Sequence, residues 1–448
     1  MYKDRLPEEW DSAPLRELVD PNRRITYGIV QPGEWQEPGK GVPLIRGQDY
    51  SSGEVAVENL RYVHENIASK YTRSTVKAGD ILLSIVGYVG LCAIVPKSAE
   101  GANITQTTAR VSPSGNIHSG YLAHYFRSPD FKEEVKKYTK GSAQPGLNLD
   151  DVEKMVVRRP QALGEQITIA RILDTLDTQI LKTEALIAKL EKVKEGLLHD
   201  LLTRGIDENG QLRPSPEQAP ELYKDSPLGL IPREWGVGSL GDLSEIVSGV
   251  TLGGKSGSSS WPLVPYLRVA NVQDGYFDLS EVKLIRVSSV DIEKYRLLPG
   301  DVLMNEGGDF DKLGRGSLWQ GQIGLCIHQN HVFRVRANPS ILNPHFLTAF
   351  SSSAMGKSYF IRSSKQSTNL ASINSTQLKD FQIPLPAKAE QELIVTELRI
   401  MASKMESEKS LLDKLITQKT GLMNDLLTGH VRVTPLLGQA QTPTPTPA

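Results

Sequence analysis

The sequence has little cysteine and no excess of charge of either sign. Cys92 and Cys326 are the only cysteines among 448 residues, which excludes a disulfide framework and favours a reducing cytoplasm. The 51 Lys and Arg residues are matched by 52 Asp and Glu residues, so the net charge is −1. Because the chain as a whole is not basic, any surface that binds nucleic acid must be local.

Long apolar runs are also missing. No apolar stretch has the length needed to span a bilayer, so a membrane protein is not expected. The opening residues, MYKDRLPEEW, do not have the pattern of a signal peptide. With 39% hydrophobic and 23% charged residues, the composition is that of a globular protein with ordinary cores.

One formal match to a catalytic motif is present. GVTLGGKSG at 249–257 fits the phosphate-loop pattern, with Lys255 as its lysine. The segment GSSSWP follows, where the pattern requires the start of a helix, so we interpret these glycines as a variable loop. A loop of this kind could still offer Lys255 and backbone amides to a DNA phosphate. A nucleotide-binding enzyme with a phosphate loop remains the alternative interpretation.

Other signs of catalysis are equally incomplete. NPHF at Asn343 lacks the second proline of the adenine methyltransferase signature, and the Gly-rich turn expected for S-adenosylmethionine is missing from both halves. A DNA methyltransferase acting alone is therefore also only an alternative. Cys326, His328 and His331 have no fourth ligand at a suitable spacing, so no metal site is predicted. Cys92 and Cys326 are expected to be small core residues, and no catalytic residue is predicted.

The sequence does contain a long internal repeat. LPEEW at 6–10 returns as IPREW at 231–235, and GLLHDLLTRG at 196–205 returns as GLMNDLLTGH at 421–430. Both pairs share a spacing of 225 residues, which also separates Glu165-Gln166 from Glu390-Gln391. Between these anchors the halves have diverged, although VPLIR at 42–46 still matches VPYLR at 264–268. The chain is therefore predicted to be a duplicated unit.

A helical repeat closes each half. Apolar residues recur at steps of three and four after Gln166 and again after Gln391, which is the rhythm of a coiled coil. Two helices of about 38 residues, each about 57 Å long, are predicted, and we expect them to pair with each other. Lys194, Lys419 and Glu408 are expected near the seam, where they would set register. The predicted seam residues are Leu173, Leu176, Ile180, Ile187, Leu190, Leu197, Leu398, Met401, Met405, Leu412, Leu415 and Leu422.

The residues before each helix have short β-branched runs separated by turns, which predicts two α/β or mainly-β domains at 1–160 and 230–385. One helix is predicted in each, at 119–138 and 343–360. Helical segments at 161–205 and 386–430 follow, a connector spans 206–229, and an unfolded tail is expected at 431–448. Trp10, Trp235 and the two Gly-Asp turns, Gly79-Asp80 and Gly300-Asp301, are expected to be structural.

A predicted domain followed by a long helix, repeated once along the chain, resembles the specificity subunit of type I restriction–modification enzymes. The resemblance covers about residues 6–430 and is carried by the paired LPEEW and IPREW openings, the V-P-x-[IL]-R segments, and the LLHDLLTRG and LMNDLLTGH endings. It implies an α+β fold in which two tandem target recognition domains are each followed by a long helix. It further implies that the helices form an antiparallel coiled coil, related by a pseudo-two-fold internal repeat.

The resemblance also implies a function. Such a chain recognises a bipartite, asymmetric site on double-stranded DNA and is itself non-catalytic. Its partners would be two methyltransferase subunits and, for cleavage, two restriction subunits. S-adenosylmethionine, ATP and Mg would be bound by those partners, and no cofactor is expected in this chain.

Residues that contact DNA are predicted from their chemistry and their place in loops. Arg, Gln, Asn, Ser and Thr contact base edges, whereas Lys, Arg and backbone amides contact phosphates. In the first half the candidates are Arg46, Gln48, Lys70, Tyr71, Arg73, Tyr88, Gln106, Thr107 and Gln144. In the second half they are Lys255, Arg268, Asn271, Arg315, Gln329, Asn330, Lys365 and Gln366.

Overall fold

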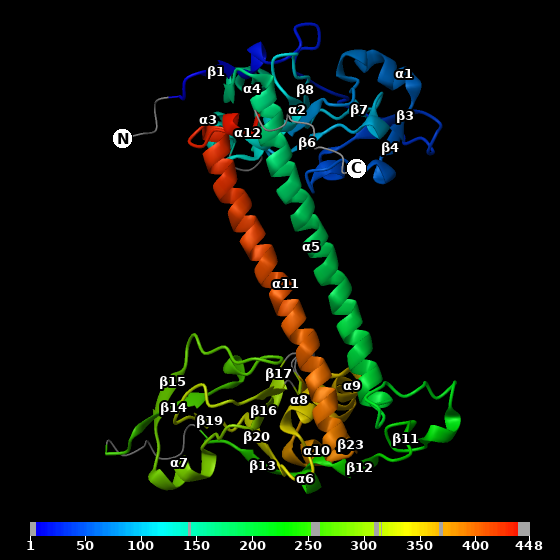
Figure 1. Ribbon diagram of the computed structural model, residues 1–448, viewed down its shortest axis with the longest axis vertical. Coiled ribbons are helices and arrows are strands. Elements are labelled where there is room, and N and C mark those ends of the chain that lie inside the picture. The colour runs from blue at the N-terminus through cyan, green and yellow to red at the C-terminus, as the bar shows by residue number, and fades with distance from the viewer. Residues whose placement is uncertain are drawn as a thin grey trace, which may run out of the picture. The chain divides into compact units, whose positions relative to one another are not determined.

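The computed structural model describes residues 6–141, 145–251, 260–308, 313–314, 316–366 and 371–437. The chain divides into two units. Unit 1 comprises residues 1–185 and 410–448, and unit 2 comprises residues 186–409. Each unit therefore contains one predicted recognition domain together with parts of both long helices (Figure 1).

Unit 1 is built on two small sheets. A four-stranded sheet has the order β2-β8-β5-β6, a three-stranded sheet has the order β4-β3-β7, and β1 pairs with β9. The strands are β1 (Trp10–Pro14), β2 (Thr26–Tyr27), β3 (Val42–Ile45), β4 (Arg61–Val63), β5 (Ile81–Ser84), β6 (Cys92–Ile94), β7 (Asn103–Ile104), β8 (Thr108–Val111) and β9 (Val156–Pro160). The helices are α1 (Glu65–Ala68), α2 (Ser119–Arg127), α3 (Pro129–Tyr138) and α4 (Leu149–Lys154).

Unit 2 has the corresponding sheets, β13-β20-β16-β18 and β15-β14-β19, and the pair β12-β23. A further small sheet has the order β17-β22-β21. Its main strands are β12 (Gly236–Ser239), β13 (Ser244–Ser248), β14 (Leu263–Leu267), β15 (Lys283–Arg286), β16 (Val302–Asn305), β17 (Gly307–Gly308), β18 (Gly316–Leu318), β19 (Ile327–His328), β20 (Val332–Ala337), β21 (Lys365–Gln366), β22 (Ala371–Ser372) and β23 (Gln382–Leu385). Two short strands in the connector, β10 (Tyr223–Lys224) and β11 (Ile231–Pro232), pair with each other.

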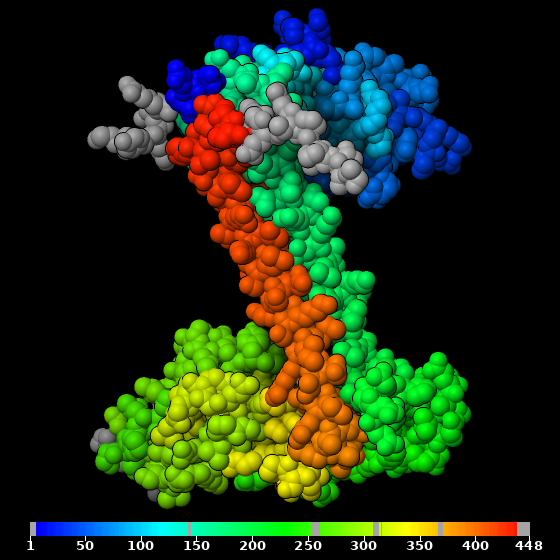
Figure 2. Space-filling model, in the orientation of Figure 1, coloured from blue at the N-terminus to red at the C-terminus, as the bar shows by residue number. Residues whose placement is uncertain are grey.

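The helices of unit 2 are α6 (Leu240–Leu243), α7 (Ser289–Tyr295), α8 (Pro344–Ser352), α9 (Ala354–Ser363) and α10 (Ser375–Lys379). Phe346 and Phe350 of α8 are buried in the same apolar cluster as Ile394 of the following long helix. The space-filling view shows the beginning of that helix lying against the residues of α8 and α9 (Figure 2). The cluster anchors the recognition domain to the helix pair.

The prediction of one helix between the sheets and the spacer was wrong in both halves. The segments predicted as single helices, 119–138 and 343–360, each contain two, namely α2 and α3 in unit 1 and α8 and α9 in unit 2. Ser128 ends α2 in an extended conformation, and its hydroxyl then accepts a bond from the N–H of Phe131 in α3. Ser353 does the same for Gly356 in α9. A serine that caps the following helix breaks the helical run, although the apolar pattern continues across it.

The long helices are α5 (Leu163–Thr203) and α11 (Lys388–Thr428), each of 41 residues and so slightly longer than predicted. They are antiparallel: in unit 1 the beginning of α5 packs on the end of α11, and in unit 2 the end of α5 packs on the beginning of α11. Leu173 thus shares a cluster with Met423 and Leu426 in unit 1, and Leu201 shares one with Ile394 in unit 2.

All the predicted seam residues are buried or half-buried, whereas Leu181 on another face of α5 is 53% exposed. Of the residues expected to set register, Lys419 forms an ion pair with Asp177. Glu408 is half-buried and Lys194 is exposed. Among the described residues, no helix is both long enough and apolar enough to cross a membrane.

A buried glutamate lies in the first turn of each long helix. Glu390 accepts bonds from the N–H of Ile206 at 2.9 Å and from Nε1 of Trp235 at 3.1 Å, and it pairs with Arg213. Ile206 lies at the start of the connector, just after α5 ends at Thr203, Arg213 lies further along the connector, and Trp235 belongs to the repeated tryptophan segment. The expectation that Trp235 is structural is therefore confirmed. Trp10 is buried in unit 1 as well.

In unit 1 the corresponding glutamate, Glu165, pairs with Arg432 at 2.7 Å. Arg432 also donates to the carbonyl oxygen of Glu8, and Val433 is buried in the unit 1 core. A short helix, α12 (Thr434–Leu437), follows. Residues 431–437 are thus packed against unit 1, which differs from the unfolded tail predicted to begin at 431. The ion pair with the buried Glu165 and the burial of Val433 hold this segment in place.

Candidate nucleic-acid interface

Five of the nine candidate DNA-contacting residues of unit 1 gather where two parallel strands end. In β3 and β7, Ile45 lies opposite Ile104, and the N–H of Thr105 donates to the carbonyl oxygen of Ile45. Arg46 directly follows β3, and Gln106 follows β7 by two residues. Parallel strands end at the same sheet edge, so these two side chains belong to one edge.

Five of the predicted residues line a single cleft of about 630 Å³ at this edge. They are Arg46, Gln48, Tyr88, Gln106 and Thr107. Ser84, at the end of β5, and the segment from Ile29 to Pro32 contribute to its walls. We call this hollow the recognition cleft. Tyr88 is 83% exposed and Gln48 and Gln106 are also exposed, so their polar and aromatic groups are available to a ligand.

Arg46 is held in place before any ligand arrives. Its Nε and Nη2 donate to the two carboxylate oxygens of Asp49 at 2.9 and 2.7 Å, and these bonds raise the pKa of the guanidinium. The guanidinium carbon also lies 6.0 Å from the ring centre of Trp35, which Arg61 approaches at 5.1 Å. An arginine fixed in this way loses little conformational entropy on binding.

Trp35 was not among the predicted residues. It is 40% exposed and lies in a loop between β2 and β3. An exposed tryptophan in a Gly- and Pro-rich loop was the only signal in the sequence, and it does not reveal that Arg46 and Arg61 lie over the ring.

Unit 2 repeats the strand pair but changes the side chains. In β14 and β19, Leu267 lies opposite His328, and the N–H of Gln329 donates to the carbonyl oxygen of Leu267 at 2.9 Å. Arg268 therefore corresponds to Arg46, and Asn330 corresponds to Gln106. Gln329 and Asn330 are half-buried. The same edge is thus present in both units, with different polar groups on it.

Asn271 does not fit the role predicted for it. Its side chain is 3% exposed, and its Nδ2 donates to the carbonyl oxygens of Asp278 and Glu281 at 2.8 and 3.0 Å. Its Oδ1 accepts from the N–H of Arg268, as Asp49 does from Arg46. A buried amide engaged with its own loop stabilises that loop and is not available to DNA.

The remaining candidates lie elsewhere. Lys70 and Lys365 are exposed but do not line the recognition cleft, and Tyr71 packs against a small apolar cluster of unit 1. Arg73 lines a different hollow. Gln144, Lys255 and Arg315 lie outside the described residues, as does the side chain of Gln366. Next to Gln144, the carbonyl oxygen of Pro145 accepts from the N–H of Gly87, beside Tyr88.

The residues considered for metal binding have other partners. Cys326 and His328 are fully buried, and Nδ1 of His328 lies 2.7 Å from the carbonyl oxygen of Val332. His331 is exposed and bonded to Glu306 at 2.5 Å. Cys92 is also buried, which confirms that both cysteines are core residues. Burial raises the pKa of the Cys326 thiol to about 12, which keeps it protonated and unreactive.

Comparison with known proteins agrees with this geometry. The sequence matches the family described as type I restriction modification DNA specificity domain twice, over residues 7–192 and 232–417. Together these matches cover most of the chain, which therefore belongs to that family of DNA specificity proteins.

The relatives include subunits of named restriction enzymes. The EcoBI specificity subunit of Escherichia coli is 34% identical over 176 residues, which are 39% of this chain and only 36% of that protein. The StySPI specificity subunit of Salmonella potsdam is 23% identical over 436 residues, or 95% of this chain and 89% of that protein. The crystal structure of the HsdS subunit from Thermoanaerobacter tengcongensis has the same fold, with a TM-score of 0.53 at 17% identity, covering 95% of this chain and 98% of that one.

Proposed function

We propose that this chain is the DNA-recognition subunit of a type I restriction–modification complex, with one recognition domain for each half of a bipartite, asymmetric site. The observation that carries the proposal is the repeated sheet edge, at which Arg46 and Gln106 in unit 1 correspond to Arg268 and Asn330 in unit 2. Arg pairs with guanine, whereas Gln and Asn pair with adenine in the major groove. Polar groups fixed at strand ends are therefore suited to base edges.

The two half-sites should differ in sequence. At equivalent positions of the two edges, Gln48 is replaced by Ala270 and Thr107 is replaced by His331. The recognition cleft of unit 1 also has Asp49 behind its arginine, where unit 2 has Asn271. Because donors and acceptors change from one edge to the other, the same bases would not satisfy both.

In this proposal the chain recognises DNA and its partners perform the chemistry in the cytoplasm. Two methyltransferase subunits would bind S-adenosylmethionine and flip a target adenine out of the duplex. Two restriction subunits would bring ATP and Mg for translocation and cleavage. The relatives' names and the coiled coil of α5 and α11, a surface suited to protein partners, support this assignment.

Methylome sequencing tests the proposal directly. Deleting the gene for this chain should abolish methylation of one bipartite adenine motif, and expression of the native chain should restore it. Gln106→Ala should make one position in one half of the motif degenerate, because removing a bidentate hydrogen bond weakens discrimination by about 1–3 kcal/mol. Gln161→Ala, an exposed glutamine of unit 1 away from the cleft, is the matched control. A motif that survives deletion of the gene would refute the function.

A further inference from the structure

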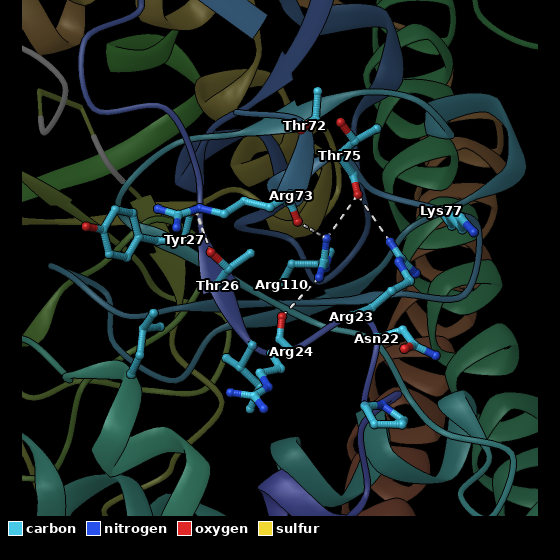
Figure 3. Close-up of a pocket in the computed structure, with 13 residues that line it drawn as sticks. Asn22, Arg23, Arg24, Thr26, Tyr27, Thr72, Arg73, Thr75, Lys77 and Arg110 are labelled. Carbon is cyan, nitrogen blue, oxygen red and sulfur yellow. Dashed lines mark hydrogen bonds between the residues drawn. The ribbon is translucent and has the colours of Figure 1, made fainter. Parts of the chain in front are cut away.

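A second hollow in unit 1 is lined by many basic and polar residues, together with Pro21, Ile25 and Leu149. It measures about 780 Å³, and Figure 3 shows the residues around it. Five of the lining residues are basic, namely Arg23, Arg24, Arg73, Lys77 and Arg110, and the lining includes no carboxylate. We call it the cationic cleft. Its walls are the segment 21–27 and the segment 72–77, which are far apart in the sequence.

Arg110 holds the two walls together. It lies in β8, is 3% exposed, and donates to the carbonyl oxygens of Arg24 at 3.0 Å, Thr75 at 3.2 Å and Arg73. Figure 3 shows these bonds converging on the guanidinium from both sides. Burial lowers the pKa of Arg110, but a guanidinium remains charged in proteins. The cleft therefore has a fixed positive charge in its floor.

The remaining cations differ in what neutralises them. Arg23 pairs with both oxygens of Asp80 at 2.7 Å. Arg24, Arg73 and Lys77 are exposed, and within the described part of the chain none of their side chains forms an ion pair. Asp20 is the other nearby carboxylate, and it accepts from the N–H of Asn22. Three exposed cations thus surround a hollow whose local acids are already engaged.

A similar buried arginine is present in unit 2, where it also pairs with Glu245 at 3.1 Å. Arg334 in β20 is 3% exposed and donates to the carbonyl oxygens of Lys294 and Arg296, both at 3.0 Å. Arg334 lies opposite Leu303, as Arg110 lies opposite Leu82 in the matching sheet. Lys294 and Arg296 are exposed, so cations occupy the position of Arg73 in the repeat. Asp301 is paired with Arg336, as Asp80 is with Arg23. Although the two halves have diverged, each retains a buried arginine that donates to the backbone carbonyl oxygens of exposed basic residues.

We propose that the cationic cleft of unit 1 binds the phosphate backbone of duplex DNA beside the bases contacted at the recognition cleft. The inference depends on the proposed function. Thr107, which directly precedes β8, lines the recognition cleft, and Arg110 within β8 lines the cationic cleft, three residues further along the chain. That separation is about 10 Å, or about three base pairs along a duplex. One duplex can thus reach both clefts, with bases read at one and phosphates neutralised at the other.

The salt dependence of DNA binding tests this proposal. The affinity for DNA is measured at several salt concentrations for the native chain in complex with its methyltransferase subunit and for the same complex with the triple variant Arg24→Gln/Arg73→Gln/Lys77→Gln. One duplex carries the methylated motif, and the other has a mixed sequence. Removing one ionic bond to a phosphate should lower the slope of log K against log salt by about 0.9. The variant should lose the same factor of affinity on both duplexes, while the methylated motif stays unchanged. Lys97→Gln/Lys132→Gln/Lys154→Gln, three exposed lysines of unit 1 outside both clefts and both long helices, is the charge-matched control.

The outcomes separate the two proposals. If the native complex binds the motif-bearing duplex preferentially and the cleft variant has the native salt slope, the cationic cleft does not bind phosphate. The inference also fails if the variant no longer copurifies with the methyltransferase subunit, because the cleft is then a protein surface. If the native complex shows no sequence preference, the proposed function itself fails.

Discussion

Single buried side chains set the electrostatics of each unit. Arg110 and Arg334 are each almost fully buried, yet both donate to backbone carbonyl oxygens, and Arg334 also pairs with Glu245 at 3.1 Å. Glu390 is similarly surrounded by donors from three segments. Hydrogen bonds offset much of the cost of burying these charges, although Nε of Arg110 and Nε of Arg334 have no partner among the described residues, and each charge joins segments that are distant in the sequence.

His328 should make the stability of unit 2 depend on pH. Burial lowers its pKa to about 4, whereas the ordinary value is 6.5. Between these values the unfolded chain binds a proton that the folded chain excludes, so the folded state loses stability as the pH falls. The loss is about 1.4 kcal/mol per pH unit across this window and is absent above pH 6.5.

Denaturant unfolding measures this effect in the native chain and in His328→Gln. The free energy of unfolding is determined at about pH 7, above the window, and at about pH 4.5, near its lower end. The glutamine variant should lose less stability between the two pH values, because its amide does not titrate. Equal losses in both proteins would show that His328 is not the group responsible.

Not every predicted contact residue has the surroundings that its role requires. Asn271 has the right chemistry for an adenine but is buried against its own loop. Arg73 lines the cationic cleft and not the recognition cleft with Arg46, so its surroundings suit a phosphate contact and not a base contact there. Chemistry and loop position were readable from the sequence, whereas burial and neighbours depend on packing.

At the scale of elements, α5 and α11 are the parts best predicted from the sequence. Their apolar spacing repeats over about ten turns, so the buried face follows from the helical period alone. The predicted single helix at 119–138 failed for a local reason. The hydroxyl of Ser128 competes with the backbone for hydrogen bonds and starts α3 anew, and periodicity does not detect such a cap.

The helix pair gives a matched test of packing. Leu173→Ala on α5 should destabilise unit 1 by about 2–5 kcal/mol, because the side chain is fully buried and leaves a cavity. Leu181→Ala on the same helix should change stability by less than about 0.5 kcal/mol, since Leu181 is 53% exposed. The free energies of unfolding in denaturant report both values. Similar losses for the two variants would contradict the observed seam.

At the scale of the whole molecule, duplication explains why different residues occupy equivalent places. Both halves retain the repeated tryptophan, the repeated glutamate and the long helix, whereas the polar side chains at the two sheet edges differ. Each recognition domain can therefore change without disturbing the other, because Gln106 and Asn330 belong to separate units and share no bonded partner in the described residues.

This separation predicts additive effects. Gln106→Ala and Asn330→Ala should each relax a different half of the methylated motif, and the double variant should relax both. Its loss in binding free energy should equal the sum of the single losses within about 0.5 kcal/mol. Binding measured on duplexes altered in one half-site at a time checks this. Relaxation of the same half by both single variants would contradict the assignment of one half-site to each unit.

The amino-acid sequence by itself determined the duplication, the two long helices and their apolar seam, because repeated motifs and a helical period follow from the order of the residues alone. It also indicated the polar segments from which the clefts are made. Only the tertiary structure decided which of those segments meet. Arg46, Tyr88 and Gln106 come from three separate loops, and Arg24 and Arg73 are joined through Arg110. Strand pairing and buried bonds between distant segments create these sites, and their energies depend on contacts that no local pattern records.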